Sequence, residues 1–188
     1  MLLAVDVGNT SSVIGLFDGE DLAAEWRIAT RYRTTDELEV VLRGLLAARQ
    51  IRPDAITSGC LSTTVPPVQG AWEEVLQRVA GTAPVVIEPG VRTGVAVRVQ
   101  NPREVGPDRI ANAAAAAALH GAPAIVVDFG TATNFDGAAT ASVRARTRAR
   151  LPRPPHCATS RPAGRRAACS RANSRAWSLI QWKVAVDS

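Results

Sequence analysis

The sequence lacks the residues on which several common classes of site depend. Its three cysteines, Cys60, Cys157 and Cys169, are odd in number and show no C-x-x-C spacing. Neither a disulfide framework nor a zinc site is therefore predicted. A G-x-x-x-x-G-K-[ST] stretch is also missing, which excludes a P-loop. The chain has one lysine, Lys183, and no H-R-D stretch, so the D-F-G at residues 128–130 does not indicate a protein kinase.

Long apolar runs are missing as well. The apolar run at the N-terminus is interrupted by Asp6, and no basic segment precedes it. We therefore predict neither a signal peptide nor a membrane span, and we expect a cytoplasmic location.

Acidic residues are almost absent from the last quarter of the chain. Residues 1–136 contain 11 Arg and 16 Asp or Glu, whereas residues 137–188 contain 11 basic residues and one acid, Asp187. The high isoelectric point therefore belongs to the C-terminal segment. It does not indicate that the rest of the chain binds nucleic acid.

Residues 2–17 predict two apolar strands joined by a tight polar turn at Gly8-Asn9-Thr10. Such a turn leaves backbone N–H groups available to an anion. Asp6, at the end of the first strand, can hold a divalent cation that bridges phosphate oxygens. An ordinary hairpin with a buried or turn-capping Asp remains an equal alternative for this stretch alone.

The segment at residues 124–133 repeats this design, with four apolar residues, Asp128, an apolar residue, a glycine and a hydroxyl cluster. Asp128 lies 122 residues after Asp6. A repeat at this spacing favours two similar halves that face each other across a nucleotide. In this respect the sequence resembles the superfamily of acetate kinase, sugar kinases, heat-shock ATPases and actin.

The intervening sequence alternates strand and helix patterns, as in a layered α/β sheet. We expect strands at residues 22–29, 54–60 and 85–87, a polar loop at 61–67, and helices that begin near residues 34 and 68.

A third informative stretch is Gly106-Pro107-Asp108-Arg109. Pro107 suits the first position of a helix, and the alanines from residue 113 propagate it. Asp108 is stabilised near a helix N-terminus by the helix dipole, but Arg109 is not. A guanidinium at that position is better explained by a carboxylate or phosphate that it binds.

Together the three motifs resemble type III pantothenate kinase over residues 1–136. The resemblance implies transfer of the ATP γ-phosphoryl group to pantothenate, the first step of coenzyme A biosynthesis. It implies Asp108 as proton acceptor, Arg109 as ligand of the pantothenate carboxylate, and Asp128 as ligand of potassium or ammonium. Pro107 replaces the alanine more usual in the motif. By resemblance, the ATP-binding residues are Asp6, Val7, Gly8, Asn9, Thr10, Ser11, Ser12, Val13 and Thr131, and the substrate-binding residues are Gly106, Pro107, Asp108 and Arg109.

The resemblance further implies a ribonuclease H-like ATPase fold, Mg²⁺ bound with ATP, and a homodimer. We expect a first domain at residues 1–120 and the start of a second at residues 121–136. Residues 137–178 contain 10 Arg and no acid, with few large aliphatic side chains. We therefore predict that residues 137–188 are a disordered basic tail that is read out of frame. The alternative for this tail is an arm that binds nucleic acid.

Two other functions stay open at this point. Proteins similar to this family have been labelled Bvg accessory factors, which implies a transcriptional role, and an ATPase of the actin type is a further candidate. The tail does not supply the walls that close around ATP in the family, so we expect the 188-residue chain to be a poor kinase or an inactive remnant.

Overall fold

The computed structural model describes residues 1–91, 93, 96–98, 101–121, 123–129, 133–139 and 142–146. Its first sheet has five strands in the order β3-β2-β1-β4-β5. The strands β1, β2 and β3 form an antiparallel meander, and β4 and β5 run parallel to β1. This mixed sheet confirms the predicted α/β class. Its strands are β1 (Leu2–Val7), β2 (Ser11–Asp18), β3 (Asp21–Ala29), β4 (Ser58–Thr63) and β5 (Val85–Val86).

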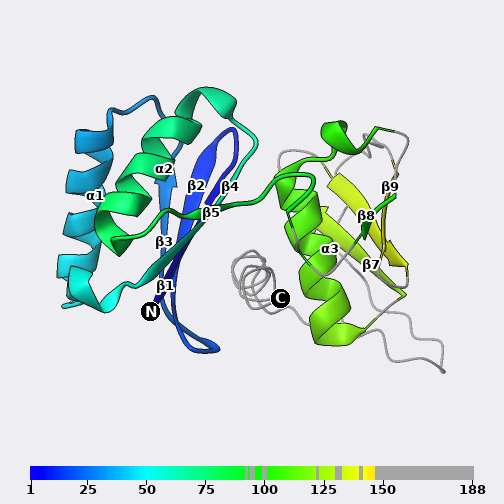
Figure 1. Ribbon diagram of the computed structural model, residues 1–188, viewed down its shortest axis with the longest axis horizontal. Coiled ribbons are helices and arrows are strands. Elements are labelled where there is room, and N and C mark those ends of the chain that lie inside the picture. The colour runs from blue at the N-terminus through cyan, green and yellow to red at the C-terminus, as the bar shows by residue number, and fades with distance from the viewer. Residues whose placement is uncertain are drawn as a thin grey trace, which may run out of the picture.

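Two helices, α1 (Thr35–Ala48) and α2 (Pro66–Ala80), cover one face of this sheet (Figure 1). The predicted start of α1 near residue 34 is confirmed, and it is capped: the side chain of Thr34 accepts a hydrogen bond from the Glu37 N–H, and the Glu37 carboxylate accepts one from the Thr34 N–H. Leu38, Leu42 and Leu46 of α1 are buried against α2 and the sheet. These helices bury the first core and leave the other face of the sheet for the rest of the chain.

That other face receives α3 (Pro107–His120), which also packs on a second sheet of order β6-β9-β8-β7. Figure 1 shows α3 on the side of the second sheet that faces the first. A helix enclosed in this way must be apolar all round and narrow, and residues 110–116 of α3 are all buried, with five alanines among them. The second sheet contains β6 (Ala96–Val97), β7 (Ala124–Phe129), β8 (Thr133–Ala139) and β9 (Ser142–Arg146).

The strand expected at residues 54–60 is displaced in the structure. Pro53–Ala55 form a 3₁₀ turn, and β4 begins at Ser58. The strand is set by parallel pairing with β1, from Leu2 opposite Ser58 to Val7 opposite Thr63. The expected loop at residues 61–67 was therefore wrong. Its first three residues complete β4, and Pro66 and Pro67 open α2, where a missing N–H costs nothing.

Ordered structure also continues past residue 136, where the sequence predicts that a disordered tail begins. Residues 137–139 belong to β8, in which Gly137 and Ala138 pair with β7, and residues 142–146 pair with β8 as β9. Backbone pairing of this kind needs no large apolar side chains, so a composition poor in aliphatic residues does not exclude it. Residues 147–188 lie outside the described residues. Within the part that is described, no helix is long and apolar enough for a membrane span.

Candidate functional site

Strand alternation turns Asp6 toward α3. Neighbouring residues of a strand point to opposite faces, so Asp6 shares a face with Ala4, which packs with Ile110 of α3. Asp6 lies opposite Ser62 of β4, and the Ser62 hydroxyl donates a 3.0 Å hydrogen bond to Asp6 Oδ1. The carboxylate is therefore held at the end of β1, on the inner side of the sheet.

The turn after β1 is closed by its own backbone. The Gly8 N–H donates to the Ser11 carbonyl at 3.1 Å, and the Gly8 carbonyl accepts from the Thr30 hydroxyl at 2.7 Å. Thr30 also shares a 2.9 Å hydrogen bond with the buried Ser12 hydroxyl. Asn9 and Thr10 are exposed at the tip. The turn thus presents Asn9 and Thr10 to an incoming group, while the Ser12 hydroxyl is used internally.

The first turn of α3 carries the predicted substrate motif. Gly106 is the N-cap of α3. Pro107 is its first helical residue, as the sequence predicts. The Asp108 carboxylate folds back over Gly106 so closely that a Cβ on residue 106 would collide with Asp108 Oδ1. Arg109, one residue on, is largely buried, with 19% of its side chain exposed.

The second sheet contributes two carboxylates beside this turn. Asp128 lies in β7, two residues after Val126, and Val126 is opposite Asp136 of β8. Asp136 is fully buried, and its Oδ1 lies 3.5 Å from Arg109 Nε. Within the described residues neither of its oxygens accepts a hydrogen bond of normal geometry, although the nearby Asn112 amide favours the ionised form.

These carboxylates influence one another across the two sheets. Burial raises the pKa of Asp6 to about 6; the Ser62 hydrogen bond opposes this rise, and the charges of Asp108 and Asp128 add to it. Burial, and then Asp108, also raises the pKa of Asp128, whereas Arg109 lowers it. Burial raises the pKa of Asp136 to about 6 against the opposing effect of Arg109. A shared effect of this kind requires the groups to lie near one another.

The structure therefore places Asp6 and Asp128 within electrostatic reach of Asp108, and Asp128 within reach of Arg109, although these four residues come from three separate motifs of the sequence. Three of the predicted ATP-binding residues do not face the site. The side chains of Val7, Ser12 and Val13 are buried in the core. Thr131 lies outside the described residues. In the described part of the chain, no three Asp, Glu, His or Cys side chains are grouped closely enough to hold a metal ion by themselves.

Three residues of this region were missed by the sequence analysis. Ser62 was assigned to a loop because of its polar neighbours, and pairing with β1 moved it into a strand. Thr30 ends the third strand and has no sequence signal of its own. Asp136 follows an apolar residue in a strand-like run, but nothing in its sequence neighbourhood distinguishes a buried carboxylate from an exposed one.

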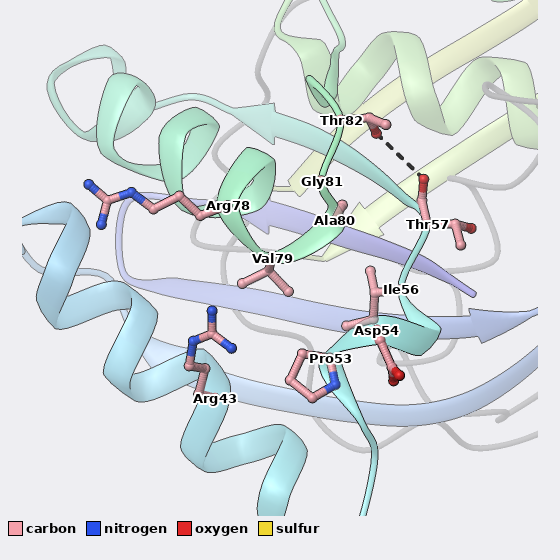
Figure 2. Close-up of a pocket in the computed structure, with 10 residues that line it drawn as sticks. All are labelled: Arg43, Pro53, Asp54, Ile56, Thr57, Arg78, Val79, Ala80, Gly81 and Thr82. Atoms are coloured by element: carbon pink, nitrogen blue, oxygen red, sulfur yellow. Dashed lines mark hydrogen bonds between the residues drawn. The ribbon is translucent and has the colours of Figure 1, made fainter.

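A separate cavity of about 460 Å³ lies at the opposite end of β1 (Figure 2). Thr57 lines it, and the Thr57 N–H donates to the carbonyl of Met1, at the start of β1. Its Arg78 is already bound by Asp36, Glu39 and Glu74, at 2.8, 3.0 and 2.7 Å. This cavity therefore lies apart from the carboxylates around α3. The charge of its Arg78 is already neutralised by acidic residues of the protein. Its lining residues are Arg43, Pro53, Asp54, Ile56, Thr57, Arg78, Val79, Ala80, Gly81 and Thr82.

Comparison with known proteins decides the family. A sequence model described as type III pantothenate kinase matches residues 2–142. The chain belongs to the type III pantothenate kinase family. The type III pantothenate kinase of Streptomyces avermitilis is 51% identical over 142 residues, and that of Acidothermus cellulolyticus is 54% identical over 138 residues. The enzyme of Moorella thermoacetica is 47% identical over 137 residues.

In each of these three alignments the match covers 72% of this chain and 54% of the relative. The chain thus spans about half the length of the curated members of the family that it matches. The region matched by the family model ends at residue 142, six residues beyond the limit of the resemblance drawn from the motifs.

Among solved structures, similarity is more distant. A putative N-acetylglucosamine kinase from Porphyromonas gingivalis matches with a TM-score of 0.44 and 15% identity, over 77% of this chain and 47% of that one. A ROK hexokinase from Thermus thermophilus matches with a TM-score of 0.43 and 16% identity, over 78% and 48% of the two chains.

Proposed function

We propose that the residues around the first turn of α3 form the site at which pantothenate is phosphorylated by ATP. The observation that carries this proposal is the convergence of Asp6, Asp108, Arg109 and Asp128 from three separate motifs. The chemistry of these groups and of the neighbouring turn suits the two substrates. The exposed side chains of Asn9 and Thr10 suit a phosphate, and the Arg109 guanidinium suits a carboxylate.

The phosphate end of the site is the turn after β1. Asn9 and Thr10 are exposed there, and the hydrogen bonds of Gly8 and Thr30 fix the turn before any ligand arrives. A preorganised set of donors loses little entropy when it binds a polyphosphate. We therefore assign the γ-phosphate of ATP to this turn.

The residues present also fit Mg²⁺ that arrives with ATP. Magnesium is commonly held by one or two carboxylates together with phosphate oxygens, so a preformed cage is not required. The Asp6 carboxylate meets this need, and the mutual repulsion of Asp6, Asp108 and Asp128 favours a cation among them. When bound, the ion neutralises charge on the phosphate oxygens.

The substrate end of the site is Gly106–Arg109. Arg109 binds the pantothenate carboxylate, and Asp108 accepts the proton of the primary hydroxyl as its oxygen attacks the γ-phosphorus. The bond between the γ-phosphorus and the bridging oxygen breaks, and ADP leaves with both bonding electrons. Because phosphoryl transfer has a loose transition state, positioning and a modest base suffice.

Several finer features come from the family resemblance. We propose that Asp128 binds potassium or ammonium, that Thr131 contacts ATP, and that the active form is a cytoplasmic homodimer. The relatives carry the name of a kinase, and no finding favours the transcriptional alternative. We also expect slow turnover by the 188-residue chain itself, because residues 137–178 have 10 Arg and few apolar side chains with which to enclose a nucleotide.

Calorimetric titration with pantothenate tests the function without depending on fast turnover. We expect the full chain to bind pantothenate and Arg109→Gln to bind it at least about tenfold more weakly, since a charge-assisted pair is lost. ADP release, measured with chain in excess over ATP, should require pantothenate and should fall in Asp108→Asn.

The matched control is Asp54→Asn, which makes the same change in the cavity at the other end of β1. It should leave both measurements unchanged. Absence of pantothenate binding by the unaltered chain, or ADP release that does not depend on pantothenate, would overturn the proposal.

A further inference from the structure

The carboxylate of Asp136 is the most unusual group near the site. It is fully buried, and within the described residues neither of its oxygens accepts a hydrogen bond of normal geometry. Burial of a carboxylate in this state is costly, and most buried polar groups are satisfied. A residue that only filled space at this position of β8 would be better apolar. The free-energy cost of burying this carboxylate therefore indicates that Asp136 has a role in the site.

The charged partner of Asp136 is Arg109. Nε of Arg109 lies 3.5 Å from Asp136 Oδ1, which is longer than the roughly 2.7–2.9 Å of a tight charge-assisted hydrogen bond. Arg109 stands in the first turn of α3, where the helix dipole disfavours a cation. A nearby negative charge offsets this unfavourable position.

The contact also has a direction. A guanidinium is planar and rigid, so a charge that attracts its Nε edge fixes where the terminal nitrogens point. Asp136 reaches Arg109 from β8, beneath α3, whereas Asp108 occupies the N-terminal end of the same helical turn. The anchor thus reaches Arg109 from another element, whereas the proposed proton acceptor stands on the same helix as Arg109.

We infer that Asp136 is a positioning residue that orients the Arg109 guanidinium toward the carboxylate of the substrate. The inference rests on the proposed function and adds to it a residue outside the three motifs. Asp136 acts through Arg109 and touches no reacting atom. Its removal should therefore affect recognition of the carboxylate and nothing else in the site.

The experiment compares two ligands by calorimetry: pantothenate and pantothenol, in which a primary alcohol replaces the carboxylate. We expect the unaltered chain to prefer pantothenate. In Asp136→Asn the affinity for pantothenate should fall about tenfold, as coupled neighbours typically show. The affinities for pantothenol and for ATP with Mg²⁺ should stay within about twofold.

A double-mutant cycle separates positioning from general damage. If Asp136 acts through Arg109, the variant Arg109→Gln with Asp136→Asn should bind pantothenate as weakly as Arg109→Gln alone. Circular dichroism checks the fold of each variant, and Asp136→Ala serves in the same panel if Asp136→Asn does not fold. Asp54→Asn is the control for loss of one carboxylate charge.

Each outcome decides the inference. Selective loss of pantothenate affinity that disappears in the Arg109→Gln background supports it. Retention of the preference for pantothenate in Asp136→Asn overturns it and leaves the proposed function intact, and so does an equal loss for both ligands. An unaltered chain that binds the two ligands equally overturns the role of Arg109 in the proposed function, and this inference with it.

Discussion

Gly106 shows how one missing side chain leaves room for the carboxylate of Asp108, the proposed proton acceptor. Its φ of −60° and ψ of 143° are open to any residue, so the need for glycine here is one of space. A Cβ would occupy the position of Asp108 Oδ1. The sequence motif predicted that Gly106 and Asp108 belong to one site, and the structure supplies the reason that they must be neighbours.

We predict that Gly106→Ala displaces the Asp108 carboxylate. Pantothenate-dependent ADP release should fall about tenfold or more, because a misplaced group loses most of the advantage of proximity. The free energy of unfolding should change by less than about 1 kcal/mol, since alanine replaces glycine at a helix N-cap. Single-turnover assays and urea denaturation measure the two effects.

Gly44→Ala is the matched control for this substitution. Gly44 lies inside α1, and a Cβ there meets nothing within 4 Å. The change should leave ADP release as it was and stabilise the chain by about 0.5–1 kcal/mol. Equal ADP release by Gly106→Ala and the unaltered chain would contradict the proposed arrangement of Asp108.

At the scale of elements, the sequence predicted those turns and helix starts that are determined by residues close together in the chain. The cap at Thr34 and the start of α3 at Pro107 depend on residues within a few positions of one another, and so does the Gly8–Ser11 hydrogen bond that closes the turn after β1. The limits of β4 were predicted wrongly because pairing with β1, more than 50 residues away, fixes them. The burial of Asp136 depends on the packing of β8 beneath α3, which sequence neighbours do not specify.

The contact between β8 and α3 should give the fold a pH dependence of unusual sign. The pKa of Asp136 is raised from 3.8 to about 6 by burial, and Arg109, Asn112, Asp108 and Asp128 are the other groups that influence it. A carboxyl whose pKa is raised on folding binds more protons in the folded state. Its contribution to stability is therefore complete below about pH 4 and is lost as the pH rises through about 6.

We predict that Asp136→Asn removes this dependence. The free energy of unfolding of the variant, relative to the unaltered chain, should rise by about 1 kcal/mol between pH 5 and pH 7.5. Urea denaturation at the two pH values measures the difference, in which the contributions of titrating groups distant from Asp136 cancel. A difference between variant and unaltered chain that is the same at both pH values would contradict a raised pKa at Asp136.

At the scale of the whole molecule, two sheets place carboxylates of like charge on either side of α3. Asp6 comes from the first sheet and Asp128 from the second. The charge of Asp108 raises the pKa of Asp6 and the pKa of Asp128. This arrangement lowers stability in the absence of a cation. A site that binds a nucleotide with Mg²⁺ gains affinity from the same repulsion, because the cation relieves it.

If the repulsion lowers the stability of the free chain and raises its affinity for ATP with Mg²⁺, Asp6→Asn should raise the stability of the free chain and weaken its stabilisation by the ligand. The amide oxygen still accepts the hydrogen bond of Ser62 and carries no charge. Without ligand at pH 7.5, where an Asp6 pKa of about 6 leaves the carboxylate ionised, the variant should be more stable by about 1–3 kcal/mol. Saturating ATP with Mg²⁺ should raise the Tm of the unaltered chain and have a much smaller effect on the variant, since ligand stabilisation follows affinity.

The control is Asp18→Asn, an exposed aspartate at the far end of β2. It should match the unaltered chain in both conditions, because its charge is solvated and distant from α3. A variant Asp6→Asn that is less stable than the unaltered chain without ligand would mean that the carboxylate serves the fold and not the ligand. Equal stabilisation of both chains by ATP with Mg²⁺ would place the metal-bound phosphates elsewhere, since the repulsion around Asp6 would then have no cation to relieve it.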